Sequence, residues 1–213
     1  MTAFAVLLSI LAAIAIGAMS PGPSFVLVSR IAVVSSRSHG LASALGMGVG
    51  GAFFAALAVL GLTALLMQFE WLYLMLKILG GGYLIYLAIK IWRGASEPLA
   101  PSGTSEKTRG ISVFRAFLLG LMTQLSNPKT SIVYASIFAA LMPPSPPIWL
   151  LFALPPIIFC VEAGWYTIVA VAFSGSRARL IYARLKRWID RGAGAVMGAL
   201  GLKLMVEAFK ART

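Results

Sequence analysis

Residues 2–29 read TAFAVLLSILAAIAIGAMSPGPSFVLVS, an apolar stretch without a charged side chain that is interrupted by Ser20-Pro21-Gly22-Pro23. About 20 apolar residues are enough for a helix to cross the hydrocarbon core of a bilayer, so the stretch predicts a membrane span. Two prolines and a glycine break the helical hydrogen-bond ladder, and broken backbone at membrane depth is tolerated where it lines a cavity. We therefore expect a broken first helix; a simple kink, or a span that ends at Pro21 at the membrane surface, are the alternatives.

The composition extends this interpretation to the whole chain. Hydrophobic residues make up 60% and charged residues 11% of 213 positions, whereas soluble domains carry about 25% charged residues. A soluble globular domain is therefore excluded. The fold class that we expect is all-α, a polytopic membrane protein of about six transmembrane helices in a single domain (1–213). The charge-poor stretches that predict these spans are 2–29, 41–69, 72–88, 116–142, 148–174 and 192–206.

The cations lie between the apolar stretches and predict the topology. Three connections, 30–39, 90–115 and 177–191, carry most of the Lys and Arg residues, whereas the turns 68–71 and 143–147 carry none. By the positive-inside rule the three basic connections are cytoplasmic, which places both termini outside. A five-span version with the N-terminus inside is the alternative. This distribution also explains the formal charge of +12 without a nucleic-acid partner. Because no basic residue precedes the first apolar run, we expect that run to stay in the mature protein rather than act as a signal peptide.

Residues 95–110 form a polar linker that divides the chain into repeat one (1–94) and repeat two (111–213). Aligning Pro21 with Pro128 without a gap pairs four further identical residues: Ser24/Ser131, Val26/Val133, Ser29/Ser136 and Ala32/Ala139. Two three-helix units would lie in opposite orientations, as in the inverted repeats of secondary transporters. Chance similarity between two apolar segments is the alternative.

Each repeat contains a helix start inside an apolar stretch. In Ser20-Pro21-Gly22-Pro23 and Ser126-Asn127-Pro128-Lys129, a capping residue precedes a proline, the pattern of a helix N-terminus. Such a start presents free N–H groups and the positive end of the helix dipole, which favours a carboxylate. The predicted substrate-binding residues are therefore Pro21, Gly22, Pro23, Asn127, Pro128 and Lys129.

Glu162 is an isolated acid in the run 148–174. An acidic residue near the bilayer centre costs about 2.5 to 3.5 kcal/mol on insertion scales, so such residues usually have a partner or a function. We expect Lys129 to be that partner. The pair is either structural, or Glu162 is the proton-coupling residue, or it contacts a substrate ammonium group.

Three other side chains, Lys77, Ser24 and Trp165, are predicted to line the cavity, although a lysine can also reach the membrane interface. Small residues at four-residue spacing, such as Gly46 and Gly50, let helices approach closely and would permit a homodimer. One cysteine and one histidine predict neither a thiol pair nor a metal site, and we expect no cofactor.

The chain resembles the LysE/RhtB family of amino-acid exporters over essentially its whole length. The resemblance rests on Pro21-Gly22-Pro23, His39-Gly40-Leu41, the segment 76–87 (LKILGGGYLIYL), Phe117-Leu118-Leu119-Gly120, Asn127-Pro128-Lys129 and Trp165-Tyr166. It implies a secondary transporter that exports amino acids or their derivatives across a prokaryotic plasma membrane, coupled to protons or another ion.

One departure concerns the second span, where many members carry an acid and this chain has Gly48-Val49-Gly50-Gly51. If that acid couples ions in relatives, coupling here rests on Glu162 or works differently. Efflux of metal cations is the alternative function. An enzyme is not expected, since no hydrolase motif is present.

Overall fold

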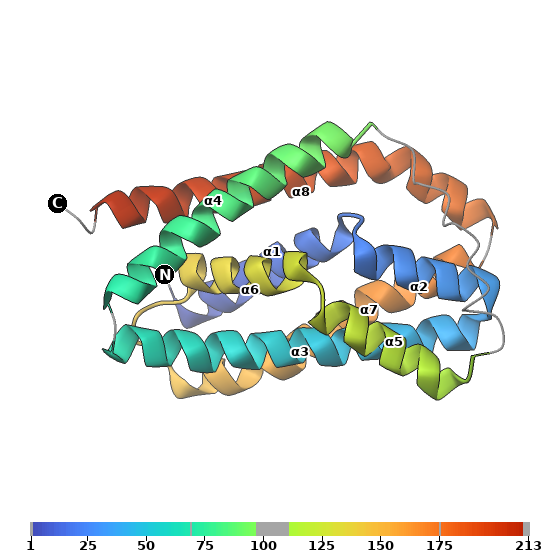
Figure 1. Cartoon of the computed structure of the whole chain (residues 1–213), viewed down its shortest axis with the longest axis horizontal. Helices are drawn as coiled ribbons and strands as arrows, with labels where there is room; N and C mark the ends of the chain where they lie inside the picture. The colour runs from blue at the N-terminus through green and yellow to red at the C-terminus, as the bar shows by residue number, and fades with distance from the viewer. Residues whose placement is uncertain (1, 69, 97–110, 175, 211–213) are drawn as a thin grey trace.

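The computed structural model describes residues 2–68, 70–96, 111–174 and 176–210, and within these ranges all regular structure is α-helical (Figure 1). The helices are α1 (Ala3–Met19), α2 (Pro23–Val34), α3 (Arg37–Gln68), α4 (Glu70–Gly94), α5 (Val113–Leu125), α6 (Pro128–Leu141), α7 (Ile148–Phe173) and α8 (Ser176–Lys210). The predicted all-α class is confirmed. Most of the predicted linker, residues 97–110, lies outside the described residues.

Both predicted helix breaks are present. Helices α1 and α2 are bent by 59° at the Ser20–Gly22 interruption, and Pro23 begins α2. Asn127 separates α5 from α6 in extended backbone conformation, and its side chain accepts a hydrogen bond from the Lys129 backbone N–H. A proline at the first helical position needs no donor there, which explains why both new helices begin where they do.

The order of elements is the same in the two halves, a broken pair followed by two long helices. Helix α3 packs along α7, and α4 packs along α8, while α1 and α6 lie between these two layers (Figure 1). This order agrees with two repeats of one unit. Their inverted symmetry stays a prediction.

The two ends of the bundle differ in charge. The α2–α3 connection, the end of α7 and the starts of α5 and α8 lie at one end (Figure 1). The start of α1, the end of α3, the α6–α7 connection and the end of α8 lie at the other (Figure 1). The segment 177–191, which was predicted as a basic connection, is instead helical and forms the first half of α8. It is rich in Arg, Ala and Leu and contains neither Pro nor Gly, and such residues favour helix. That the end with the start of α8 is cytoplasmic stays a prediction from the positive-inside rule.

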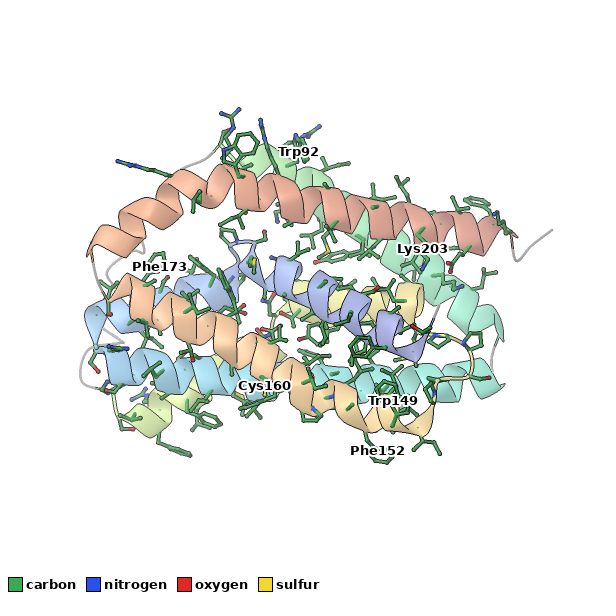
Figure 2. The ribbon with its side chains drawn as sticks, turned by 180° about the vertical axis from the view of Figure 1, so that it is seen from behind. Trp92, Trp149, Phe152, Cys160, Phe173 and Lys203 are labelled. Carbon is green, nitrogen blue, oxygen red and sulfur yellow. The ribbon has the colours of Figure 1, made fainter. Side chains whose placement is uncertain are left out.

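The exterior of the bundle is apolar, as expected for contact with lipid. Phe152 on α7 is 77% exposed and points away from the bundle in Figure 2. Within the described residues, three helical segments are long and apolar enough to cross a membrane: Arg37–Gly61, Ile148–Phe173 and Arg184–Lys210. The bent pair α1–α2 adds a fourth if it is one span. The chain is a polytopic membrane protein, and the count of six spans stays a prediction.

Helices α3 and α5 approach at backbone contact through Gly46 and Gly120. A Cβ atom on Gly46 would overlap the Phe117 carbonyl oxygen, and one on Gly120 would overlap the Ser43 carbonyl oxygen. The small residues therefore pack helices of the same chain. The homodimer stays a prediction.

Candidate functional site

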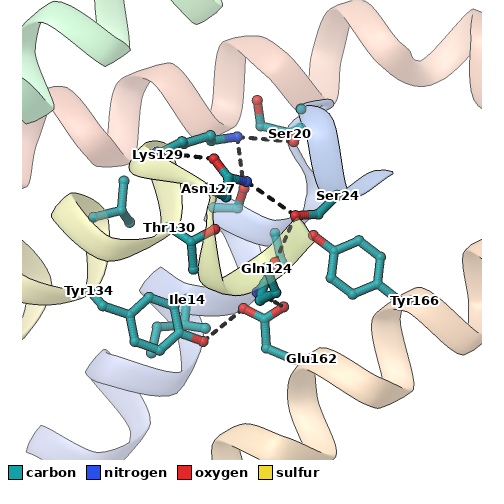
Figure 3. A pocket seen from close by; sticks show the side chains of 14 residues that line it. Ile14, Ser20, Ser24, Gln124, Asn127, Lys129, Thr130, Tyr134, Glu162 and Tyr166 are labelled. Atoms are coloured by element: carbon teal, nitrogen blue, oxygen red, sulfur yellow. Dashed lines mark hydrogen bonds between the residues drawn. The ribbon is translucent and has the colours of Figure 1, made fainter. Parts of the chain in front are cut away.

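The two helix breaks meet at Lys129. Its Nζ atom donates to the carbonyl oxygens of Ser20 (3.1 Å) and Gly17 (3.4 Å), at the end of α1. A cation is favourable there because the last carbonyl groups of a helix lack intrahelical partners. Asn127 adds a second link, since its Nδ2 donates to Ser24 Oγ on α2 at 3.1 Å. The first turn of α6 is thus joined to both sides of the first break (Figure 3).

A chain of buried hydrogen bonds connects this junction to Glu162 (Figure 3). Ser24 Oγ donates to Gln124 Oε1 at 2.7 Å, and Gln124 Nε2 donates to Glu162 Oε2 at 3.2 Å. Tyr134 Oη donates to Glu162 Oε1 at 2.8 Å. Glu162 is only 3% exposed, and a buried carboxylate of this kind needs such donors. We call Ser24, Gln124, Tyr134 and Glu162 the polar relay.

Gly51 on α3 makes room for Glu162. A Cβ atom at position 51 would lie 2.8 Å from Glu162 Cγ and 3.0 Å from Tyr134 Oη, which is closer than ordinary van der Waals contact. Gly51 is the last residue of the segment 48–51, where the sequence departs from many members of the family that it resembles, and it lies directly against the acid on α7.

Two cavities adjoin the junction. The smaller one, about 30 Å³, is lined by the polar relay together with Ser20, Gly22, Asn127 and Lys129, among others; a cavity of this size has room for a water molecule or two. The larger one, about 840 Å³, extends between the two helix breaks, α4 and α8. Lys129 lies on the wall of both cavities.

The structure brings all six predicted substrate-binding residues to the larger cavity. They are Pro21, Gly22, Pro23, Asn127, Pro128 and Lys129. Ser24, which we expected to line a cavity, lines the smaller one. That these residues bind a substrate stays a prediction.

The expected ion pair between Lys129 and Glu162 is not formed. The carboxylate accepts its hydrogen bonds from the neutral donors Tyr134 and Gln124, and the ammonium group donates to main-chain oxygens instead. Figure 3 shows Gln124 and Asn127 between the two charged groups. Each charge thus has separate partners.

Two other predicted cavity residues lie elsewhere. Lys77 pairs with Glu207 on α8, with 3.0 Å between Nζ and Oε2, and neither of the two cavities includes it. The sequence around Lys77 does not predict Glu207 as its partner, because the two residues are 130 positions apart in the chain. Trp165 packs beside a cluster that contains Phe25 and Tyr166, and it also lies outside both cavities.

Sequence reasoning missed two members of the polar relay, Gln124 and Tyr134. Gln124 was detectable as an amide in the charge-poor run 116–142, but Tyr134 resembles any aromatic residue in an apolar helix. Among the described residues, no group of three or more His, Cys, Asp or Glu side chains could hold a metal ion.

An α-helical bundle with an apolar exterior, two broken helices and a buried polar centre defines a class, the polytopic membrane transporters. The chain belongs to the LysE family, because residues 15–208 match the family described as LysE type translocator. It is therefore a multi-pass protein of the bacterial inner membrane and a solute exporter.

Several relatives match along most of their length. A protein of Escherichia coli (strain K12) named threonine efflux protein is 34% identical over 192 residues, which cover 89% of this chain and 92% of the relative. The E. coli (strain K12) uncharacterized membrane protein YahN is 30% identical, covering 91% of this chain and 86% of the relative. An uncharacterized membrane protein of Haemophilus influenzae is 29% identical, covering 89% and 90%. No solved structure matches the chain.

Proposed function

We propose that the chain exports amino acids or their derivatives from the cytoplasm by alternating access, coupled to the proton motive force. The observation that carries the proposal is the meeting of the two helix breaks at Lys129 on the wall of the 840 Å³ cavity. This volume lies within the range of small-molecule sites, about 300–1,000 Å³. The relatives named threonine efflux protein support amino-acid export, and L-threonine is the first substrate to test.

The junction offers partners for a substrate carboxylate. The Lys129 ammonium group has three N–H donors, and two of them are directed at Ser20 and Gly17, so a third is available. The N-termini of α2 and α6 add the positive ends of two helix dipoles. An amino acid that enters the large cavity would place its carboxylate between these groups.

The polar relay supplies a route for coupling. A substrate that displaces Asn127 from Ser24 removes a donor to the first member of the relay, and the bonds of the relay lead from Ser24 to Glu162. In the proposal, Glu162 takes up and releases the coupling proton. A change of its charge changes the strength of the bonds from Tyr134 and Gln124, which couples protonation to the helix breaks.

The test is release of amino acids from loaded cells. Cells that lack their own exporters are loaded with dipeptides, each of which yields one of the standard amino acids, and release is followed with and without a protonophore. Wild-type protein should release at least one amino acid faster than cells without it, and the protonophore should slow this release. If no amino acid is released faster than from cells without the protein, the proposed function is contradicted.

Two substitutions separate the roles of the charged groups. Lys129→Gln should weaken release by raising the internal concentration needed for half-maximal rate, because it removes a carboxylate partner. Glu162→Gln should abolish the sensitivity to the protonophore. Cys160→Ser is the matched control, since Cys160 is exposed on the outer face of α7 (Figure 2). Wild-type behaviour of Glu162→Gln would remove this residue from the coupling mechanism.

A further inference from the structure

The large cavity carries basic side chains along its length. Lys90 and Arg93, both exposed, lie on the last turns of α4, and Lys186 lies on the first half of α8. Lys129 lies at the helix breaks. Because α4 ends and α8 begins next to basic connections, the part of the cavity at Lys90 and Arg93 is expected to open to the cytoplasm.

Most of this positive charge is not compensated. Lys186 is neutralised by Asp190, with 2.8 Å between Nζ and Oδ2, and it also donates to the Gly94 carbonyl oxygen at 2.9 Å. Glu207, which pairs with Lys77 and Lys203, is not part of this cavity wall. The described wall of this cavity thus carries four cations, Lys90, Arg93, Lys129 and Lys186, and one acid, Asp190, which leaves it with a net positive charge.

Such a lining attracts a solute's carboxylate group before the solute reaches the helix breaks. Charges of one sign in a cleft with low-dielectric walls focus the electric field and raise the local concentration of oppositely charged solutes. Lys90 lies 5.9 Å from the centre of the Tyr86 ring, so its ammonium group stays near the cavity wall.

We propose that the cytoplasmic part of this cavity is a carboxylate-collecting vestibule, in which Lys90 and Arg93 bind the carboxylate of the substrate before Lys129 receives it. The inference rests on the proposed function and narrows its substrate class to solutes with a free carboxylate. Protonated amines without a carboxylate, such as L-threonine amide, are repelled by the same cations. Lys90 and Arg93 are thus specificity-determining residues outside the two helix breaks.

The arrangement at the other end of the bundle agrees with a cavity that opens at the basic end. There Lys203 Nζ donates to the Ala140 carbonyl oxygen at 2.6 Å, which ties α8 to the last turn of α6. Lys77 and Glu207 tie α4 to α8 close by. Glu162 lies on the wall of the small cavity and not of the large one, so a solute that enters the vestibule meets the vestibule cations before it meets Glu162.

The experiment uses inverted membrane vesicles, whose cytoplasmic face is outside, and the full chain. Initial uptake rates of the twenty standard L-amino acids, L-threonine first, are measured at low and at high salt. For the double variant Lys90→Gln/Arg93→Gln, the half-saturating concentration should rise about two- to thirtyfold at low salt, the range for the loss of two exposed charge pairs. The maximal rate should be retained, and the difference from wild type should shrink at about 0.5 M salt because of screening.

The matched control is Arg184→Gln/Arg187→Gln. These two arginines are exposed on α8 near the same end of the bundle but are not part of the cavity wall. Inhibition by L-threonine amide, which lacks the carboxylate, should be no weaker in the Lys90→Gln/Arg93→Gln vesicles than in wild type.

The possible outcomes distinguish the vestibule from the proposed function, amino-acid export. An unchanged half-saturating concentration in the Lys90→Gln/Arg93→Gln vesicles would overturn the vestibule and leave amino-acid export intact. An equal rise in the control variant would assign the effect to general surface charge and also overturn it. If wild-type vesicles take up none of the amino acids, the proposed function fails and the vestibule with it.

Discussion

The hydrogen bond between Tyr134 Oη and Glu162 Oε1 can be measured by a double-mutant cycle with Tyr134→Phe and Glu162→Leu. The two atoms are 2.8 Å apart, and both side chains are at most 3% exposed. A hydrogen bond to a charged group contributes about 1.5–3 kcal/mol. Tyr134→Phe alone should therefore lower the free energy of unfolding by about that amount.

In the Glu162→Leu background the same substitution should cost about nothing, because the hydroxyl group there has already lost its acceptor. Removing a buried hydroxyl without a partner can even be favourable. The cycle should thus give a coupling energy of about 1.5–3 kcal/mol. Glu162→Leu also removes the hydrogen bond from Gln124. This loss is the same in the single variant Glu162→Leu and in the double variant with Tyr134→Phe, so it cancels in the cycle.

The assay is reversible unfolding of the purified protein in mixed micelles of a mild detergent and sodium dodecyl sulfate, followed by fluorescence of the five tryptophans. Tyr83→Phe is the control, since Tyr83 lies on α4 at the large cavity and should give additive effects with Glu162→Leu. If Tyr134→Phe costs the same free energy in both backgrounds, the bond is absent from the native state and the relay is wrong at its last step.

Two further predictions concern the helices that hold the site. Gly120→Ala should destabilise the protein by about 1–3 kcal/mol, because the added methyl group meets the Ser43 carbonyl oxygen on α3. The control is Gly164→Ala, whose added methyl group meets no atom within 4 Å and which should be neutral or stabilising by up to about 1 kcal/mol. Equal changes in the free energy of unfolding for the two variants in the micelle assay would contradict the close packing of α3 and α5. Asn127→Ala should lower the free energy of unfolding by about 1 kcal/mol because α6 loses its N-cap, and by a further amount because the hydrogen bond to Ser24 is lost. Asn127→Asp should keep the N-cap. Equal unfolding curves for the two variants would contradict the capping role.

The broken helices could be predicted from the sequence because their causes are local. Pro21, Pro23 and Pro128 remove backbone donors, and Asn127 supplies a cap within two residues of the helix that it starts. The apolar runs and the placement of cations are equally local. They predicted an all-α membrane protein, which the structure shows (Figure 1). The segment 177–191, predicted as a connection, lies within α8 instead.

The partners of the charged side chains could not be predicted in this way. Lys129 was expected beside Glu162, yet it donates to the end of α1. Lys77 was expected at the cavity, yet it pairs with Glu207, and 130 residues separate the two in the chain. Gln124 and Tyr134 were not recognised, although they bind Glu162.

The physical reason lies in the helices themselves. Helix α7, for example, carries buried and exposed apolar side chains around its whole circumference, as Ile158 and Phe152 illustrate. A helix that is apolar on all sides has no hydrophobic stripe to show which face meets its neighbours, so its rotation and register are decided by packing. Local backbone chemistry in the sequence determined where the helices break, and only the tertiary structure decided which polar side chains meet at the breaks.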